Sequence, residues 1–200
     1  MIAIPCDAAT PALLGFFLYM VAFMDTVATI PTGSMAERWK WKSFVIWGLF
    51  CGAIYYPLFG AWTWGGGWLA KLGVMDFAGG IVVHATAGVS ALLFAKAVGP
   101  RDGFPKNLDP PHNPGMTMIG ACMLWVGWYG FNGGSALAAD SNAAMAITVT
   151  HLSACAAGMT WAALEWIKFG RPSLMGAVTG VIAGLATVTP ASGVIGPLGG

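Results

Sequence analysis

The 200-residue chain is 57% hydrophobic and 8% charged, and its formal net charge is +1. These proportions indicate a membrane protein and exclude a soluble helical domain. The chain has no basic stretch with interleaved aromatic residues, which argues against a nucleic-acid partner. The cysteines stand singly, so we predict neither a metal site nor a disulfide framework, and no cofactor. We interpret them as small core residues: Cys6, Cys51, Cys122 and Cys155.

Six apolar segments of near membrane-spanning length follow one another along the chain, separated by short polar or Pro/Gly-rich connections. They cover residues 12–33, 43–61, 77–98, 116–139, 143–167 and 173–193. After the second comes the aromatic and glycine-rich stretch 62–68, which we interpret as irregular backbone at the membrane interface. The sequence therefore predicts an all-α polytopic membrane protein, with a single transmembrane domain over residues 1–200.

Basic residues occur in alternate connections between these segments. The connection after the first span carries Arg38, Lys40 and Lys42. Five more basic residues belong to the same side: Lys96, Arg101, Lys106, Lys168 and Arg171. The opposite side has only Lys71. By the positive-inside rule the basic connections are cytoplasmic, so the N-terminal end and the loops with Trp64 and Asp76 face outward. We predict a multi-pass protein of the plasma or inner membrane.

Glycines at regular helical spacing indicate where helices approach one another closely. In the sixth span Gly176, Gly180 and Gly184 recur at every fourth residue. Such a stripe of small residues lets two helix backbones pack against each other. In the third span Gly80 and Gly88 lie four residues on either side of His84, and we expect them to leave space around its ring.

Aromatic residues form two short helical stripes toward the outer side. In the fourth span Trp128, Phe131 and Ser135 are three and four residues apart, so they share one face that ends in a hydroxyl. Tyr19 and Phe23 form a shorter stripe in the first span. Aromatic faces hold a desolvated cation with about 2 kcal/mol or more, and a serine oxygen accepts hydrogen bonds. The pattern suits a small cation with N–H groups, although simple helix packing is the commoner explanation.

Ionisable residues inside apolar spans need partners or a function. Asp76 begins the third span, where it would cap backbone N–H groups, a role compatible with a functional one. His84 lies about 12 Å deeper, where a pore or relay role competes with satisfied packing. Asp25 in the first span is expected to face the protein interior and to bond either to backbone freed near Pro31 or to a helix that is not in this chain, with no function assigned. His151 in the fifth span is interpreted as a packing or pore-distal residue.

Several motifs in order resemble the ammonium transporter family of Amt, Mep and Rh proteins. They are Asp76-Phe77-Ala78-Gly79-Gly80 with His84, Trp64-Gly65-Gly66-Gly67, the run from Gly127 to Ser135, Ala36-Glu37-Arg38, and Thr189-Pro190-Ala191. The resemblance extends over the chain from about residue 12 onward. It implies an ammonium-transporter-like helical bundle containing about six of the roughly eleven family spans, as a partial domain truncated at both ends.

The resemblance also implies roles for the residues that match the family motifs. Trp64 and Ser135 would line the outer site that recruits ammonium or methylammonium, and Tyr19 would lie at its vestibule. Phe23 and Phe131 would form a stacked phenyl gate below it, and Trp128 would flank the pore. Asp76 would be the essential acidic residue near the site, and His84 the first of two paired pore histidines. The second pore histidine would lie in a later helix that is not in this chain.

The function implied is recruitment of ammonium, its deprotonation, and conduction of ammonia through the bilayer. The resemblance further implies a homotrimer and cytoplasmic PII-type regulators. A sensor that binds ammonium with little net transport would use the same outer site. An enzyme is not expected, because the chain lacks the His-Glu-x-x-His and Gly-x-Ser-x-Gly motifs of hydrolases. A purely structural subunit would not need the aromatic stripe, the acidic cap and the buried histidine together.

Overall fold

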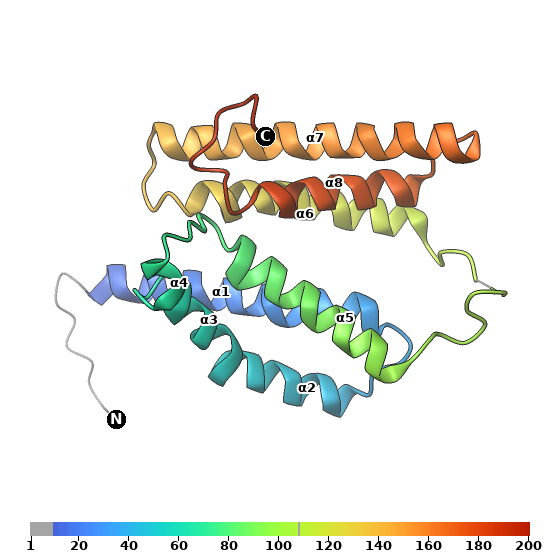
Figure 1. Ribbon diagram of the computed structural model, residues 1–200, viewed down its shortest axis with the longest axis horizontal. Helices are drawn as coiled ribbons and strands as arrows, with labels where there is room; N and C mark the ends of the chain where they lie inside the picture. The colour runs from blue at the N-terminus through green and yellow to red at the C-terminus, as the bar shows by residue number, and fades with distance from the viewer. Residues whose placement is uncertain (1–9, 108) are drawn as a thin grey trace. The chain divides into compact units, whose positions relative to one another are not determined.

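The structure, a computed structural model, describes residues 10–107 and 109–200, and all regular secondary structure in this part of the chain is helical. Cys6 lies outside the described residues. Figure 1 shows the helices as long, roughly parallel or antiparallel rods within each group of neighbours. This agrees with the all-α fold predicted from the sequence.

Each predicted span corresponds to one helical segment. The segments are α1 (Thr10–Met35), α2 with η1 and α3 (Trp41–Phe50, Cys51–Tyr55 and Tyr56–Thr63), η2 with α5 (Gly80–Ala85 and Thr86–Val98), α6 (Pro114–Gly134), α7 (Ser141–Phe169) and α8 (Leu174–Val188). The elements η1 and η2 are π-helical turns that continue directly into α3 and α5. A short helix, α4 (Trp68–Lys71), lies between the second and third segments.

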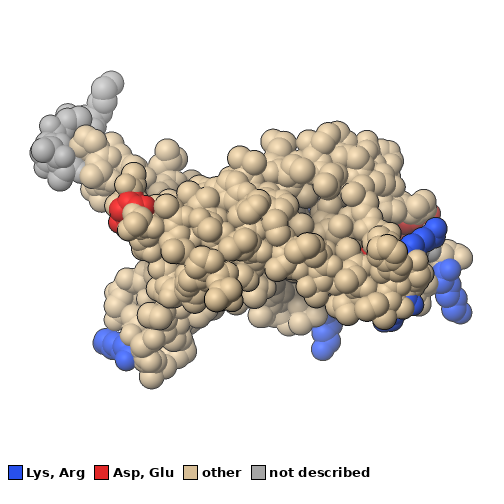
Figure 2. All heavy atoms as spheres, turned by 90° about the horizontal axis from the view of Figure 1, so that it is seen from above, with Lys and Arg blue, Asp and Glu red and all other residues tan. Residues whose placement is uncertain are grey.

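Four of these segments are long and apolar enough to cross a membrane: residues 10–35, 41–71, 80–98 and 141–169. Helix α8 is a shorter apolar helix. Large apolar side chains are exposed on the described surface, among them Ile167, Leu72 and Met123. Most of the face seen in Figure 2 carries neither basic nor acidic residues. A surface of this kind suits contact with lipid, and the chain is a membrane protein.

The stretch 62–68 is more regular than its composition suggested. Trp62 and Thr63 complete α3, and Trp68 begins α4, so the irregular backbone is confined to residues 64–67. The expectation of irregular structure over the whole stretch was therefore wrong at both ends. Glycine content marked the turn itself.

The contacts within the chain define two compact units. Unit 1 contains the residues up to Gly67 together with Val82–Asp102, and unit 2 contains Trp68–Ile81 and Gly103–Gly200. In unit 1, α1 packs along α5, and Phe23, Val27 and Met35 are buried. In unit 2, α6, α7 and α8 pack against one another around Trp128 and Leu185. Each unit thus has its own core.

The predicted glycine stripe in α8 is the contact surface for α7. A Cβ atom added to Gly180 would lie 2.6 Å from the Trp161 Cβ, and one added to Gly184 would lie 2.5 Å from the Ser153 carbonyl oxygen. Real Cβ atoms do not approach other atoms so closely, so both positions require glycine. The Ser153 hydroxyl also donates to the Gly184 carbonyl at 3.0 Å. The small-residue spacing therefore predicted this helix pair correctly.

Candidate functional site

Three of the predicted substrate-binding residues meet in unit 1. Tyr19 and Phe23 are four residues apart on α1, and their ring centroids lie 4.5 Å apart. The Phe23 ring meets the Trp64 ring edge-on, with centroids 5.9 Å apart and an interplanar angle of 74°. Phe23 is 2% exposed, so the middle ring of the cluster is held inside the unit. The structure therefore brings Tyr19, Phe23 and Trp64 together into one aromatic cluster.

The glycines after Trp64 explain how this side chain is placed. Trp64 is the C-cap of α3, and its N–H donates to the Gly60 carbonyl. Gly66 has a φ of 75°, which favours glycine. A Cβ atom on Gly67 would lie 2.6 Å from the Trp62 Cα, so the chain turns back on the helix end too tightly for a side chain. The turn fixes Trp64 at the end of α3, beside Phe23.

Asp76 caps the start of η2, as its position at the head of an apolar span predicted. Its Oδ1 accepts from the N–H groups of Gly79 and Gly80 at 2.9 and 2.6 Å, and its Oδ2 accepts from Ile81 at 2.8 Å. The residue is 7% exposed. Helix starts leave N–H groups without intrahelical acceptors, and burial makes each of them costly. The carboxylate supplies those acceptors inside unit 2.

The segment after Asp76 packs on the segment after α8, so two of the resemblance motifs touch. The Phe77 N–H donates to the Pro190 carbonyl at 2.9 Å. A Cβ atom on Gly80 would lie 2.5 Å from the Pro190 Cβ, and one on Gly193 would run into the Phe77 ring. Gly80 therefore serves the close approach of Pro190. We had expected Gly80 to leave room around the His84 ring. The structure instead explains this glycine by its contact with Pro190.

His84 lies in the π-helical turn η2, just before α5 begins, and its side chain is half-buried. A Cβ atom on Gly88 would meet nothing within 4 Å, so this glycine does lie beside open space. Turns of π-helix inside longer helices occur frequently at functional sites. The pore or relay role of His84 stays a prediction.

The predicted stripe on α6 is hydrogen-bonded within unit 2. The Trp128 indole N–H donates to the Thr189 hydroxyl at 2.9 Å, and that hydroxyl donates to the Leu185 carbonyl at 2.7 Å. The Phe131 ring lies 5.8 Å from the Trp128 ring. One turn further, the Ser135 hydroxyl donates to the Phe131 carbonyl at 2.7 Å. Trp128 is thus held by the end of α8, and Phe131 and Ser135 continue the same stripe along α6.

A buried polar pair that the sequence did not predict, Asn132 and Thr150, lies beside this stripe. Asn132 and Thr150 are both fully buried, and the Asn132 amide donates to the Thr150 hydroxyl at 2.8 Å. The Thr150 hydroxyl in turn donates a hydrogen bond to the Ala146 carbonyl at 2.6 Å. The amide oxygen of Asn132 has no hydrogen-bond partner among the described residues. An asparagine within an otherwise apolar span was the available signal, since such residues join membrane helices.

The two remaining ionisable residues of the spans have different surroundings. Asp25 is exposed on α1 among the described residues, and its expected place in the interior of the whole protein stays a prediction. The His151 Nδ1 atom forms a hydrogen bond with the Tyr129 hydroxyl at 2.7 Å, and the His151 ring lies 5.4 Å from the Trp125 ring. Its other nitrogen is 3.7 Å from the Cys155 sulfur. The contacts with Tyr129 and Trp125 join α7 to α6, in agreement with a packing role.

The predicted site residues therefore form two groups, each organised within its own unit. Tyr19, Phe23 and Trp64 form the group in unit 1, and His84 also lies in this unit. Trp128, Phe131 and Ser135 form the group in unit 2, which also contains the Asp76 cap. The first group offers aromatic faces, and the second combines an aromatic pair with a serine hydroxyl.

Comparison with known proteins gives the relationship of the chain. A family model described as the Ammonium Transporter Family matches residues 4–200. Ammonium transporter Amt1 of Archaeoglobus fulgidus is 48% identical over 180 residues, which cover 90% of this chain and 46% of the relative. The ammonium transporter of Bacillus subtilis is 39% identical and matches 91% of this chain and 45% of the relative. The chain spans about half the length of the curated relatives it matches.

Solved structures agree with the fold. A structure titled Sensor Amt Protein superposes with a TM-score of 0.88 at 36% identity, over 92% of this chain and 48% of its own. Mep2 of Saccharomyces cerevisiae superposes with a TM-score of 0.81 at 34% identity, over 88% of this chain and 40% of its own. The fold, the motif positions and the family match agree with the resemblance seen in the sequence, and the chain belongs to the ammonium transporter family.

Proposed function

We propose that the whole protein transports ammonium or ammonia across the membrane, with the aromatic cluster of unit 1 as part of its substrate site. The observation that carries this proposal is the edge-on contact of Phe23 with Trp64, beside the Tyr19 ring. Aromatic faces attract desolvated cations, and the contact holds these rings in a fixed arrangement. In this proposal Trp64 recruits ammonium, Tyr19 lines the vestibule, and Phe23 forms one ring of the gate.

The polar contribution would come from the stripe on α6. The Ser135 hydroxyl donates its hydrogen to the Phe131 carbonyl, and a hydroxyl that donates in this way accepts hydrogen bonds through its oxygen. An oxygen acting as an acceptor suits ammonium, which has only N–H donors. Phe131 would form the second ring of the gate, and Trp128, held by Thr189, would flank the pore.

Asp76 and His84 would act below and beside the recruitment site. The three backbone hydrogen bonds of Asp76 support a positioning role, in which the carboxylate fixes the start of the pore helix without contacting substrate. His84 follows on the same helical segment, where an imidazole can line a pore or accept a proton from ammonium. Ammonia would then cross the apolar region, with the proton relayed separately.

Further properties of the whole protein are proposed on the same family basis. The connection with Arg38, Lys40 and Lys42 would be cytoplasmic, and the N-terminal end and the loops with Trp64 and Asp76 would face outward. The protein would form a homotrimer in the cell membrane and would bind cytoplasmic PII-type regulators. Methylammonium would be a second substrate, and the protein would not be an enzyme.

A second candidate function is sensing, in which ammonium binds at the same outer site with little net transport. The specific observation in its favour is the superposition on the solved structure titled Sensor Amt Protein, with a TM-score of 0.88. Both candidates share the recruitment site, and they differ in whether the substrate passes through.

Uptake of labelled methylammonium separates the two candidates. The intact protein and its variants would be expressed in cells that lack their own ammonium transporters. We expect uptake by the unaltered protein, loss of uptake with Asp76→Ala, and loss or altered selectivity with His84→Ala. Asp140→Ala is the matched control, because Asp140 also caps a helix but lies exposed. Ammonium binding without uptake by a well-expressed protein would favour the sensor and overturn the transport proposal.

A further inference from the structure

Three hydroxyl groups of unit 1 adjoin the π-helical turn that carries His84. Thr86 is the first residue of α5, two positions after His84, and Ser90 lies one turn further along the same helix. Both Thr86 and Ser90 are buried. The third hydroxyl belongs to Tyr55, the last residue of the other π-helical turn, η1. All four residues lie in unit 1.

The Thr86 hydroxyl bonds to the turn itself. It lies 2.7 Å from the Val82 carbonyl oxygen and 2.9 Å from the Val83 carbonyl oxygen, so these two carbonyls share its hydrogen. A π-helical turn pairs residues i and i+5, and the return to the α-helical pairing of i and i+4 leaves one carbonyl without a backbone donor. A buried carbonyl of this kind is costly unless a side chain supplies the donor. The Thr86 hydroxyl is placed to supply it, one residue past the end of η2.

The backbone carbonyl of Thr86 is bonded as well, from two side chains. The Tyr55 hydroxyl donates to it at 3.2 Å. The Ser90 hydroxyl lies 2.8 Å from the same carbonyl oxygen and 3.1 Å from the Tyr55 hydroxyl. One hydrogen-bond network therefore joins the two π-helical turns. Thr148, on the regular helix α7, shows the common arrangement of a helix threonine, with its hydroxyl donating to the carbonyl four residues earlier at 2.9 Å.

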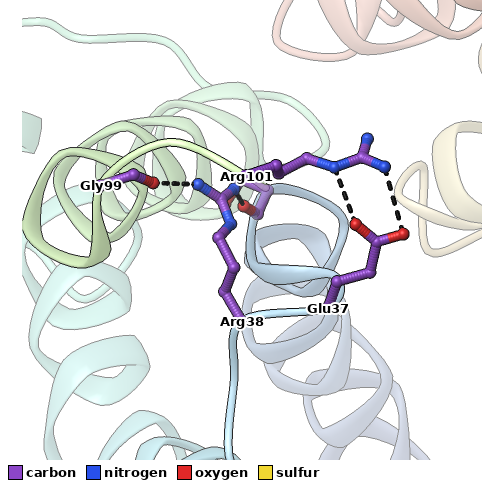
Figure 3. Close-up of polar contacts among 5 residues, drawn as sticks. Glu37, Arg38, Gly99 and Arg101 are labelled. Atoms are coloured by element: carbon purple, nitrogen blue, oxygen red, sulfur yellow. Dashed lines mark hydrogen bonds and ion pairs between the residues drawn. The ribbon is translucent and has the colours of Figure 1, made fainter. Parts of the chain in front are cut away.

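The opposite end of α5 is fixed to the end of α1, as Figure 3 shows. The guanidinium of Arg38, which follows α1, donates to the carbonyl of Gly99, the C-cap of α5. Arg101 forms an ion pair with Glu37 through two hydrogen bonds, at 2.8 and 3.1 Å. Between these ends α1 packs along α5. Because α5 is held along its length, the direction in which His84 projects from this segment depends on the π-helical turn.

We propose that Thr86, supported by Tyr55 and Ser90, is a positioning residue for His84: its hydroxyl holds the π-helical turn, and the turn sets the direction of the imidazole relative to α5. The functional part of this inference rests on the proposed pore role of His84. A shift of one residue in helical register turns a side chain by about 100° around the axis. A turn that relaxed to α-helical pairing would therefore move the imidazole by a comparable angle. Thr86 acts through His84 and does not contact the substrate.

Nitrogen-15 NMR of the intact, histidine-labelled protein in lipid bilayers tests the positioning directly, with the His84 ring signals assigned by their loss in His84→Ala. Thr86→Val matches threonine in shape but removes the hydroxyl, and we expect it to shift these signals. Thr86→Ser keeps the hydroxyl and should restore them. Thr148→Val removes a hydroxyl from the regular helix α7 and should leave them unchanged. Unchanged signals in Thr86→Val, or equal shifts in Thr148→Val, would overturn the proposal.

Uptake of labelled methylammonium by the same variants connects this position with function. We expect Thr86→Val to lower uptake at least about threefold and up to about 100-fold, because small displacements of a working group have effects of this size. Thr86→Ser should stay close to the unaltered protein, and Tyr55→Phe should act in the same direction but more weakly. Lost uptake with unshifted His84 signals would overturn the inference, since Thr86 would then act independently of His84.

The two measurements also separate this inference from the function on which it rests. The His84 signals are recorded without transport, so they decide the positioning role whether or not the protein carries ammonium. Shifted signals with unchanged uptake would confirm the positioning and overturn the pore role of His84. Shifted signals with no uptake by the unaltered protein would confirm the positioning and overturn the transport proposal.

Discussion

Two helices of this chain begin with an aspartate cap, and they differ in where the cap lies. At the start of α7, the Asp140 side chain accepts from the N–H groups of Asn142 and Ala143, both at 3.0 Å, and the residue is exposed. At the start of η2, Asp76 bonds to three N–H groups and is 7% exposed. At Asp140, water can replace the carboxylate as the acceptor of the backbone N–H groups. At Asp76, the protein encloses the carboxylate and its hydrogen bonds.

The surroundings extend this difference beyond the caps. The turn after Asp76 is fixed by tertiary contacts, with the Phe77 N–H on the Pro190 carbonyl and Gly80 against the proline ring. The first turn of α7 carries exposed Ser141 and Asn142. A buried carboxylate in a tightly packed turn can set the geometry of a neighbouring site. An exposed carboxylate mainly stabilises its own helix.

The largest expected effect is that of Asp76→Ala. The substitution leaves one buried and two partly buried N–H groups without their acceptor, and a fully buried group of this kind costs about 1–3 kcal/mol. We therefore expect a loss of stability of about 3 kcal/mol, measured by reversible unfolding in mixed detergent and SDS, together with loss of methylammonium uptake. A variant as stable as the unaltered protein would show that water reaches this cap, which would remove the contrast with Asp140.

Gly80→Ala tests whether the packing around the buried cap matters as much as the cap. A Cβ atom at position 80 would lie 2.5 Å from the Pro190 Cβ. We therefore expect this substitution to lower the free energy of unfolding by about 1–3 kcal/mol. Gly88→Ala is the matched control on the continuation of the same helix, where nothing lies within 4 Å. That substitution should be neutral, or stabilising by up to about 1 kcal/mol through helix propensity. Similar losses in the two variants would contradict the packing explanation.

Local features of this chain were readable from sequence because each depends on residues a few positions apart. The Asp76 cap, the Tyr19–Phe23 contact and the glycine stripe of α8 belong to this class, as do the six helical segments. The partner of Asp25 could not be read in this way, because the cost of a carboxylate in a span indicates that it needs water or a partner, without indicating which one.

Features that depend on distant parts of the chain could not be read in the same way. The reason for glycine at position 80 is Pro190, and the partner of Trp128 is Thr189 at the end of another helix. The π-helical turns η1 and η2 also escaped prediction, because one altered turn barely changes an apolar pattern. The distribution of basic residues and the family resemblance both placed Phe23 and Trp64 toward the outer side, whereas the contact of their rings was not predicted.

Thr189→Val tests a buried hydrogen bond between uncharged groups. Its expected effect on stability lies between those of Asp76→Ala and Asp140→Ala. Valine matches threonine in shape but removes the acceptor of the Trp128 indole N–H, which is buried with it. We expect a destabilisation of about 1–2 kcal/mol in the same unfolding measurement. Thr189→Ser keeps the hydroxyl and should retain most of this contribution. If serine is as harmful as valine, the methyl group and not the hydrogen bond stabilises the contact.

The smallest effects belong to Asp140, the exposed member of the pair. Asp140→Ala should cost about 1 kcal/mol, the usual contribution of a helix N-cap, and uptake should stay unchanged. Asp140→Asn should be nearly neutral, because asparagine caps as well as aspartate and water solvates either side chain. Asp76→Asn places a side-chain N–H donor where a backbone N–H already points. We therefore expect it to destabilise the protein more than Asp140→Asn does. Equal unfolding midpoints for the two asparagine variants would mean that burial does not distinguish these caps, and that Asp76 influences uptake through its charge.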